Sequence, residues 1–445
     1  MLRRLKDNPG LLAGFFAQAL QYGAGLILMP FVVSRLSVAE VGIWYVFLAV
    51  QSLATVADFG FQPTFARFFS LAHSGVPALA REGITVAGDG TPNVALTRSL
   101  LSVARRLYLI LALATLALLC VFGTPYVSNL AKVGGIDVGY IRASWLLFAS
   151  AVAVSLYFMW IPAFLLGSSK VASNYVYLIF SRGGFALFGI VVLLAGGGLL
   201  ALAAGFLASQ LVARLIAVAM LRGTTATGTQ PGTREETRIV LAAVWPNASR
   251  LGLVAIGAFF ITRYNIFLLS STLGLKASAS YGICFQLLSG ISSVGQLPIQ
   301  ASLAKVVSAR VTGDTARFRR LIAGSAAFYG AIYILGAGIV ILGGDMLLAL
   351  IGSRVELLPR ATLAVFAMVI ALEGFHSMAA FVITTRNAVP FVLPALLSGV
   401  AVAVSTTAAV KLGYGVAGVV ICQGLVQLAY NNWKWPLMVY RECRA

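Results

Sequence analysis

The sequence predicts an all-α polytopic membrane protein with twelve transmembrane helices in two six-helix lobes. Composition is the first reason: 60% of the 445 residues are hydrophobic and only 10% are charged, with a mean hydropathy of +0.94. Soluble domains carry about 25% charged residues. The second reason is length, because about 20 apolar residues cross a bilayer as a helix and twelve such runs occupy nearly the whole chain. No room remains for a soluble catalytic domain, so an enzyme is not predicted.

The twelve predicted spans follow one another with short connections. We expect the first to be retained, because the apolar run from Leu11 to Val33 exceeds the core of a signal peptide and further spans follow directly. The spans cover residues 10–34, 40–66, 99–122, 143–166, 172–194, 199–221, 241–270, 278–304, 321–343, 361–384, 388–410 and 415–438.

The distribution of basic residues predicts the orientation of the chain. Twelve spans place both termini on the same side of the membrane. Eighteen of the 32 Lys and Arg residues fall on that side, seven fall on the opposite side, and the rest lie within or at the edges of spans. Because cytoplasmic loops carry the excess of Lys and Arg, both termini are predicted to be cytoplasmic. The net charge of +19 is therefore explained mainly by basic residues in cytoplasmic loops. Because these residues are scattered singly between apolar runs, they do not predict binding of nucleic acid.

A polar linker near the middle divides the chain into two lobes. The linker spans residues 223–238, between an N-terminal lobe of residues 1–222 and a C-terminal lobe of residues 239–445. Matches in the same order support an internal repeat, such as IRASWLLFA in the first lobe with PRATLAVFA in the second. Six spans per lobe predict a pseudo-two-fold axis along the membrane normal. Pro9 and Pro246 are expected in the first turn of the helix that opens each lobe.

Arginines inside apolar runs are the main candidates for substrate binding. An arginine at bilayer depth costs about 3 kcal/mol on insertion scales and persists mainly where it faces protein or a watery cavity. The seventh span holds Arg250 and Arg263. On one continuous helix, Asn247 and Asn265 share a face with Arg250, and Arg263 points about 140° away unless the helix bends at a glycine. Pairing with a carboxylate is the alternative for Arg250, and snorkelling to the interface is the alternative for Arg263.

Three other arginines carry alternatives that the sequence leaves open. Arg182 lies near the middle of the fifth span, where it either lines the cavity or accompanies close helix packing through the glycines that follow it. Arg67 ends the second span at the expected cytoplasmic mouth, where it captures a diphosphate or touches anionic lipid head groups. Arg214 in the sixth span is close enough to the cytoplasmic end to snorkel, which favours a structural role.

Two acidic residues within spans are candidates for ion coupling. Glu373 lies near the middle of the tenth span, with His376 about one turn further on the same face. A carboxylate at this depth either couples transport to protons or forms a static salt bridge with an arginine. Asp58 precedes Gly60, so it either takes part in coupling or stabilises a broken helix by accepting hydrogen bonds from freed backbone N–H groups.

Motifs for other chemistry are absent from the sequence. The four cysteines have no CxxC or metal-ligand spacing. We find no phosphate-binding loop, no arrangement of serine, histidine and aspartate, and no metal constellation. The sequence therefore predicts no catalytic residue, no metal and no cofactor.

The segment from Pro30 to Phe69 carries a family resemblance. It reads PFVVSRLSVAEVGIWYVFLAVQSLATVADFGFQPTFARFF, with Glu-x-Gly in a small turn, an aromatic second helix, an Asp-Phe-Gly step and an arginine near its end. In this order it resembles Wzx-type polysaccharide flippases, which handle O-antigen or exopolysaccharide units, of the multidrug/oligosaccharidyl-lipid/polysaccharide exporter superfamily. The resemblance covers the twelve spans as well. Lipid II flippases of the same superfamily usually have fourteen spans, which this chain lacks.

The resemblance implies a V-shaped pair of lobes that works by alternating access in the bacterial cytoplasmic (inner) membrane. It implies an undecaprenyl-diphosphate-linked oligosaccharide as the substrate, flipped from the inner to the outer leaflet for surface polysaccharide assembly. Its implied partners are this lipid-linked oligosaccharide, membrane lipids, a polysaccharide polymerase and chain-length machinery. The alternative is a multidrug exporter of the same superfamily. A membrane-embedded polymerase or ligase is a third interpretation, which the short outer loops disfavour.

Overall fold

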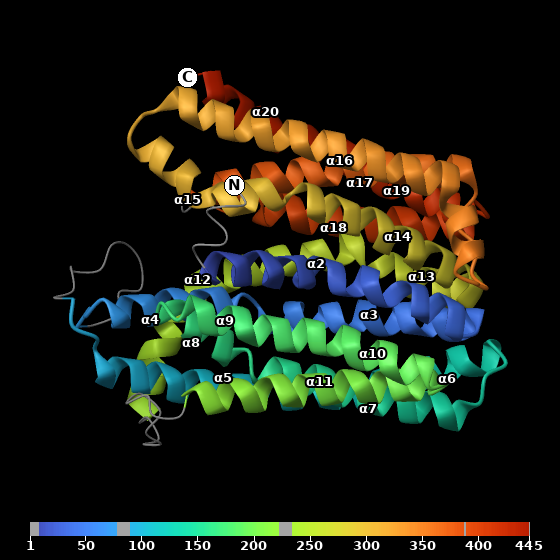
Figure 1. Ribbon diagram of the computed structural model, residues 1–445, viewed down its shortest axis with the longest axis horizontal. Coiled ribbons are helices and arrows are strands. Elements are labelled where there is room, and N and C mark those ends of the chain that lie inside the picture. Colours follow the sequence, from blue (N-terminus) through green and yellow to red (C-terminus); the bar gives the residue numbers. More distant parts are fainter. Residues whose placement is uncertain (1–8, 78–89, 222–233, 387–388, 445) are drawn as a thin grey trace. The chain divides into compact units, whose positions relative to one another are not determined.

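The computed structural model describes residues 9–77, 90–221, 234–386 and 389–444 (Figure 1). Within these ranges every regular element is a helix and there is no strand. Ten helical stretches are long and apolar enough to cross a membrane, judged by length and composition of the described residues. The remaining two predicted spans fall on α2 (Pro9–Arg35), and on α19 (Gly415–Ala429) together with α20 (Asn431–Arg444).

The chain divides into two compact units, each with more contacts within itself than with the other. Unit 1 comprises Met1–Leu28 and Val50–Ala255, and unit 2 comprises Met29–Ala49 and Ile256–Ala445. Three helices therefore contribute to both units: α2, α3 (Val38–Asp58) and α12 (Arg234–Thr262). The predicted lobe boundary at residues 223–238 lies largely outside the described residues and stays a prediction.

Unit 1 is built from the first part of α2, the last part of α3, the helices between α3 and α12, and the first part of α12. Its further elements are α4 (Phe61–His73), α5 (Val94–Leu118), the π-helical turn η1 (Leu119–Gly123), α6 (Thr124–Val133), α7 (Val138–Tyr157), α8 (Trp160–Gly167), α9 (Val171–Leu178), the π-helical turn η2 (Ile179–Gly183), α10 (Gly184–Leu194) and α11 (Gly198–Leu221). Helix α11 packs along both α7 and α10, as Figure 1 shows. An aromatic core joins α4, α5 and α8, where the rings of Phe69 and Phe164 meet edge to face at 5.3 Å between their centroids.

Unit 2 contains the last part of α12 and the helices that follow it. These are α13 (Tyr264–Thr272), α14 (Leu275–Gly295), α15 (Leu297–Val311), α16 (Thr315–Leu350), α17 (Arg360–Thr384), α18 (Val392–Lys411), α19 and α20. The first part of α3 packs on α14 here, where Gly42 lies so close to Leu275 that a Cβ would stand 2.4 Å from its carbonyl oxygen. Helices α16 and α17 run side by side in the upper part of Figure 1.

Two predictions about the seventh span are wrong. Pro246 lies inside α12 and not in its first turn, because the helix already begins at Arg234. The second correction concerns Arg263, which separates α12 from α13. Asn265 therefore belongs to a different helix from Arg250, so the predicted face shared by Asn247, Arg250 and Asn265 does not exist on one continuous helix.

Candidate functional site

The fifth predicted span contains a π-helical turn, η2, at the place of its central arginine. The turn covers Ile179–Gly183 and therefore includes Ser181 and Arg182. A π-helical turn inside an α-helix is rare and is frequently found at functional sites, because the extra residue re-aims neighbouring side chains. The sequence gives no period that reveals this turn; the Ser-Arg-Gly-Gly sequence was its only signal.

Arg182 is exposed on the surface of unit 1. Its guanidinium makes no hydrogen bond or ion pair with any other residue that the structure describes, and no carboxylate compensates it there. Since the side chain projects from the middle of a 24-residue span, Val171–Leu194, exposure to lipid tails would be costly. The position therefore suits a water-filled surface or a bound anion.

Arg214 on α11 lies beside the same turn and is almost fully buried, at 3% exposure. Its Nη1 donates to Ser181 Oγ at 3.2 Å and its Nη2 donates to Ser155 Oγ at 3.3 Å. The guanidinium carbon also lies 5.1 Å from the ring centroid of Tyr177. The expectation that Arg214 snorkels is therefore wrong, because two hydroxyl groups and an aromatic face hold it inside the unit.

Together these residues form a cationic cluster, which we define as Tyr177, Ser181, Arg182 and Arg214. Tyr177 lies within electrostatic range of both guanidinium groups. Neither arginine has an ion pair with a described acidic residue. Two positive charges close together repel each other in a low-dielectric surrounding unless an anion lies near them. Arg182 was predicted from the sequence as a substrate-binding residue, which stays a prediction, whereas Arg214 was given a structural role.

Asp58 is the buried acid of unit 1, at 5% exposure. Its Oδ1 accepts hydrogen bonds from the Tyr108 hydroxyl at 2.6 Å and from the Gln62 backbone N–H at 3.1 Å. The chain turns just after it, since Phe59 and Gly60 have φ angles of 49° and 74°. Asp58 therefore stabilises a broken helix at the start of α4, and its role in ion coupling stays a prediction.

The other predicted residues of unit 1 lie on its periphery. Arg250 and Arg67 are exposed, and Asn247 is half-buried. Arg250 lies two residues before Gly252, which packs directly on the ring of Phe59. Their contact with substrate stays a prediction.

A polar network crosses four helices of unit 2. Asn265 on α13 donates through Nδ2 to Gln423 Oε1 on α19 at 2.8 Å and to the Tyr281 hydroxyl on α14 at 3.3 Å. Gln423 Nε2 donates to Glu373 Oε1 on α17 at 2.9 Å. Asn265, Tyr281 and Gln423 have no exposed surface, whereas Glu373 is half-buried. Glu373 is therefore the one member of this network with part of its side chain on the surface of unit 2.

Glu373 has no ion pair with a described arginine, so the predicted static salt bridge is absent from the described residues. Its carboxylate is held by the amide of Gln423 instead. His376 is half-buried on the same helix, and its Nδ1 has no hydrogen-bond partner among the described residues. The role of Glu373 and His376 in ion coupling stays a prediction.

Arg263 stands at the break between α12 and α13. Its guanidinium carbon lies 4.9 Å from the ring centroid of Phe285 on α14. A cation over an aromatic face is partly compensated by the ring quadrupole. Arg263 is therefore held by packing on Phe285 in unit 2, and it forms no ion pair with a carboxylate that the structure describes.

Metal ligation finds no support in the described residues. No group of three or more His, Cys, Asp or Glu side chains is placed to hold an ion there. The four cysteines are free thiols.

Comparison with known proteins identifies the fold. No family model matches the chain, and no curated protein matches it. Among solved structures, an inward-facing multidrug resistance MATE family transporter of the MOP superfamily matches with a TM-score of 0.68 at 13% identity, covering 95% of this chain and 94% of that one. The MATE multidrug transporter DinF-BH, solved as a complex, matches with a TM-score of 0.63 at 11% identity, covering 96% of this chain and 93% of that one.

A third solved structure with the same fold has a binding pocket that is described as reversed in polarity. It is a MOP superfamily transporter from Pyrococcus furiosus, with a TM-score of 0.54 at 13% identity, covering 98% of this chain and 94% of that one. Its description states that the reverse polarity of its binding pocket suggests a different function. These likenesses confirm the predicted class of fold, a twelve-helix transporter fold with two lobes.

Proposed function

We propose that this protein is a secondary transporter that moves an amphiphilic substrate bearing an anionic group by alternating access. The observation that carries the proposal is the cationic cluster around η2. Arg182 has no partner among the described residues, and Arg214 is held by two serines with no carboxylate beside it. A guanidinium donates several directed hydrogen bonds and stays charged, which suits a phosphate or carboxylate ligand.

One candidate substrate is a lipid-linked oligosaccharide diphosphate, as the resemblance of residues 30–69 implies. The diphosphate would meet the guanidinium group of Arg182, and the lipid chain would remain in the bilayer. The two arginines of the cluster favour this candidate, because no described acidic residue pairs with them and a diphosphate would supply the missing negative charge. Assembly with a polymerase and chain-length machinery belongs to this candidate.

The other candidate is export of small molecules, and the fold comparisons favour it, since the transporters reported above include multidrug transporters. The cluster sets a limit on this candidate. A cationic drug would be repelled by Arg182 and Arg214, whereas an anionic one would be attracted. We therefore expect an exported small molecule to carry a negative charge.

Transport assays with three probes separate these candidates. The full chain would be reconstituted in vesicles and offered an undecaprenyl-diphosphate oligosaccharide, a fluorescent anionic dye and a fluorescent cationic dye. Movement of the first alone supports flipping, and movement of the anionic dye supports small-molecule export. Movement of the cationic dye alone would contradict the proposed anion preference.

Replacing Arg182 tests the cluster directly. We expect Arg182→Ala to reduce transport of the anionic probe at least tenfold, because a charge-assisted hydrogen bond is worth about 1.5–3 kcal/mol. The thermal melting point should stay unchanged, since the side chain contacts no described partner. Lys132→Ala, which removes an exposed cation from α6 of the same unit, is the matched control. Normal transport by Arg182→Ala would remove this residue from the substrate path.

A further inference from the structure

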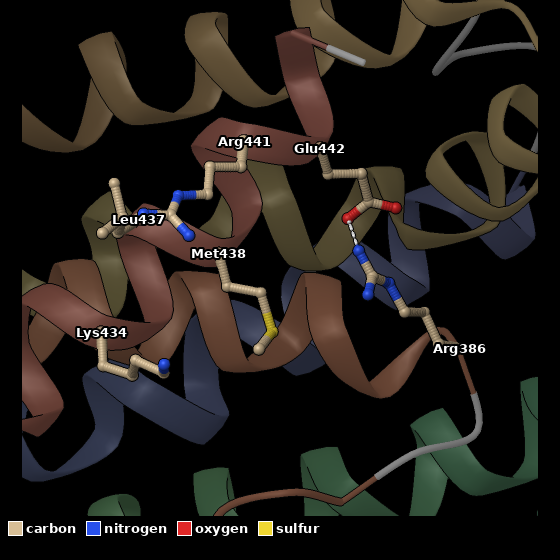
Figure 2. Close-up of a pocket in the computed structure, with 6 residues that line it drawn as sticks. All are labelled: Arg386, Lys434, Leu437, Met438, Arg441 and Glu442. Atoms are coloured by element: carbon tan, nitrogen blue, oxygen red, sulfur yellow. Dashed lines mark ion pairs between the residues drawn. The ribbon is translucent and has the colours of Figure 1, made fainter.

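A pocket separate from the cluster lies between the end of α17 and helix α20. Its volume is about 400 Å³, and it is lined by Arg386, Lys434, Leu437, Met438, Arg441 and Glu442. Figure 2 shows these side chains around the pocket, five of them from α20. All six belong to unit 2.

Helix α20 presents two apolar side chains between two cationic ones to this pocket. Lys434, Leu437, Met438 and Arg441 follow the spacing i, i+3, i+4, i+7, which places them on one face of a helix. A neighbouring face packs inside unit 2 through four buried residues, Asn431, Asn432, Trp435 and Val439. The pocket face therefore combines two charges with two apolar side chains over a short length.

The charges in this pocket do not cancel. Glu442 is the only acid in the lining, and its carboxylate already pairs with Arg310 Nε at 2.8 Å and with Arg386 Nη2, the pair drawn in Figure 2. Lys434 and Arg441 make no side-chain hydrogen bond or ion pair with any residue that the structure describes. Two cations are thus left for a ligand, beside an arginine that Glu442 fixes in place.

We propose that this pocket binds the phosphate head group of an acidic membrane phospholipid. Phosphate is the shared chemistry of a lipid head group and a soluble phosphate ester. The lipid is favoured because Leu437 and Met438 supply apolar contacts that a soluble phosphate would not use. Trp433 and Tyr440 of the same helix are exposed, and such aromatic residues gather at the level of lipid head groups. The proposal does not depend on the transported substrate.

Native mass spectrometry of the full chain in detergent tests this binding. The protein would be titrated with phosphatidylglycerol and, separately, with phosphatidylcholine. We expect the wild type to prefer phosphatidylglycerol for the first lipid bound. Lys434→Ala with Arg441→Ala should weaken that binding roughly 25-fold, about fivefold for each cation near an anionic surface. Binding of phosphatidylcholine should not change.

Matched variants and a soluble competitor make the outcome decisive. Arg317→Ala with Arg320→Ala removes two exposed cations from the first turns of α16 and should leave the preference intact. If Lys434→Ala with Arg441→Ala fails to fold, glutamine at both positions replaces alanine. Unchanged binding by the α20 variant, or an equal loss in the α16 variant, would overturn the proposal. Displacement of the lipid by an equal concentration of glycerol 3-phosphate would overturn the choice of a lipid.

Discussion

Two arginines of unit 1, Arg182 and Arg214, show that the side chains around an arginine decide whether it has a structural role or is free to bind a ligand. Arg214 is buried and satisfied by Ser155, Ser181 and the face of Tyr177. Arg182 is exposed and has no partner among the described residues. Both are arginines in apolar spans, so composition treats them alike. Only the hydroxyl groups that reach Arg214 from neighbouring helices distinguish a structural arginine from one that is free to meet a ligand.

Replacing Glu373 tests proton coupling at the residue scale. Glu373→Gln keeps an acceptor for the amide of Gln423 but cannot exchange a proton. We expect transport driven by a pH gradient to fall at least tenfold and the remaining rate to lose its dependence on pH. Uptake into vesicles with clamped internal and external pH measures both effects.

The control for this prediction is Glu356→Gln. Glu356 pairs with Lys276 at 3.0 Å, and its side chain is 74% exposed, so the pair contributes little and transport should be unchanged. If Glu373→Gln takes up substrate as fast as the wild type under a pH gradient, Glu373 does not couple protons and serves only in the polar network.

At the scale of elements, breaks within spans position the polar groups. Asp58 precedes the turn between α3 and α4, Arg263 lies between α12 and α13, and Arg182 lies in η2. Freed backbone groups at such breaks need partners, because none come from lipid. The Asp58 carboxylate supplies one by accepting the N–H of Gln62. Each of these irregular turns therefore carries a polar side chain within or at the end of an apolar helical stretch.

The α3–α4 break makes a sharp prediction for Gly60. Its φ of 74° is left-handed, and a Cβ would lie 2.5 Å from Leu251 Cβ and 2.9 Å from the carbonyl oxygen of Ala248. We expect Gly60→Ala to lower the free energy of unfolding by roughly 2 kcal/mol, from backbone strain together with this overlap. Thermal melting of the purified protein measures the loss.

Gly330→Ala is the matched substitution on α16. No atom lies within 4 Å of where its Cβ would stand, so alanine in this helix should leave stability unchanged or raise it by about 0.5–1 kcal/mol. Equal melting points for the two variants would show that the α3–α4 turn tolerates a side chain.

For the whole molecule, the division into two compact units does not follow the order of the spans along the chain. Helices α2, α3 and α12 each contribute residues to both compact units. A linear division at a polar linker does not anticipate this sharing. In each unit the polar groups of interest come from helices distant in sequence, as Glu373 and Gln423 from α17 and α19 meet Asn265 from α13.

Topology provides a test at this scale. Because basic residues are concentrated on one side of the predicted spans, we expect tags after Gly232 and at the C-terminus to be cytoplasmic. Intact cells should not be labelled at either tag by a membrane-impermeant reagent, whereas permeabilised cells should be labelled at both. A tag in the predicted outer loop at Gly135 is the positive control. Labelling of either cytoplasmic tag in intact cells would overturn the orientation.

The sequence by itself determined the class of fold, because hydrophobic runs of membrane length and their charge bias follow from the solvent alone. It also determined that Glu373, Asp58 and the interior arginines are polar groups at costly depth. Tertiary structure decided how each is satisfied. The angular argument for Arg250 and Asn265 failed because a helix period extends only to the next break, and the break at Arg263 leaves no mark in hydropathy. The serines that hold Arg214 and the amide that holds Glu373 come from other helices, so no pattern along one helix reveals them.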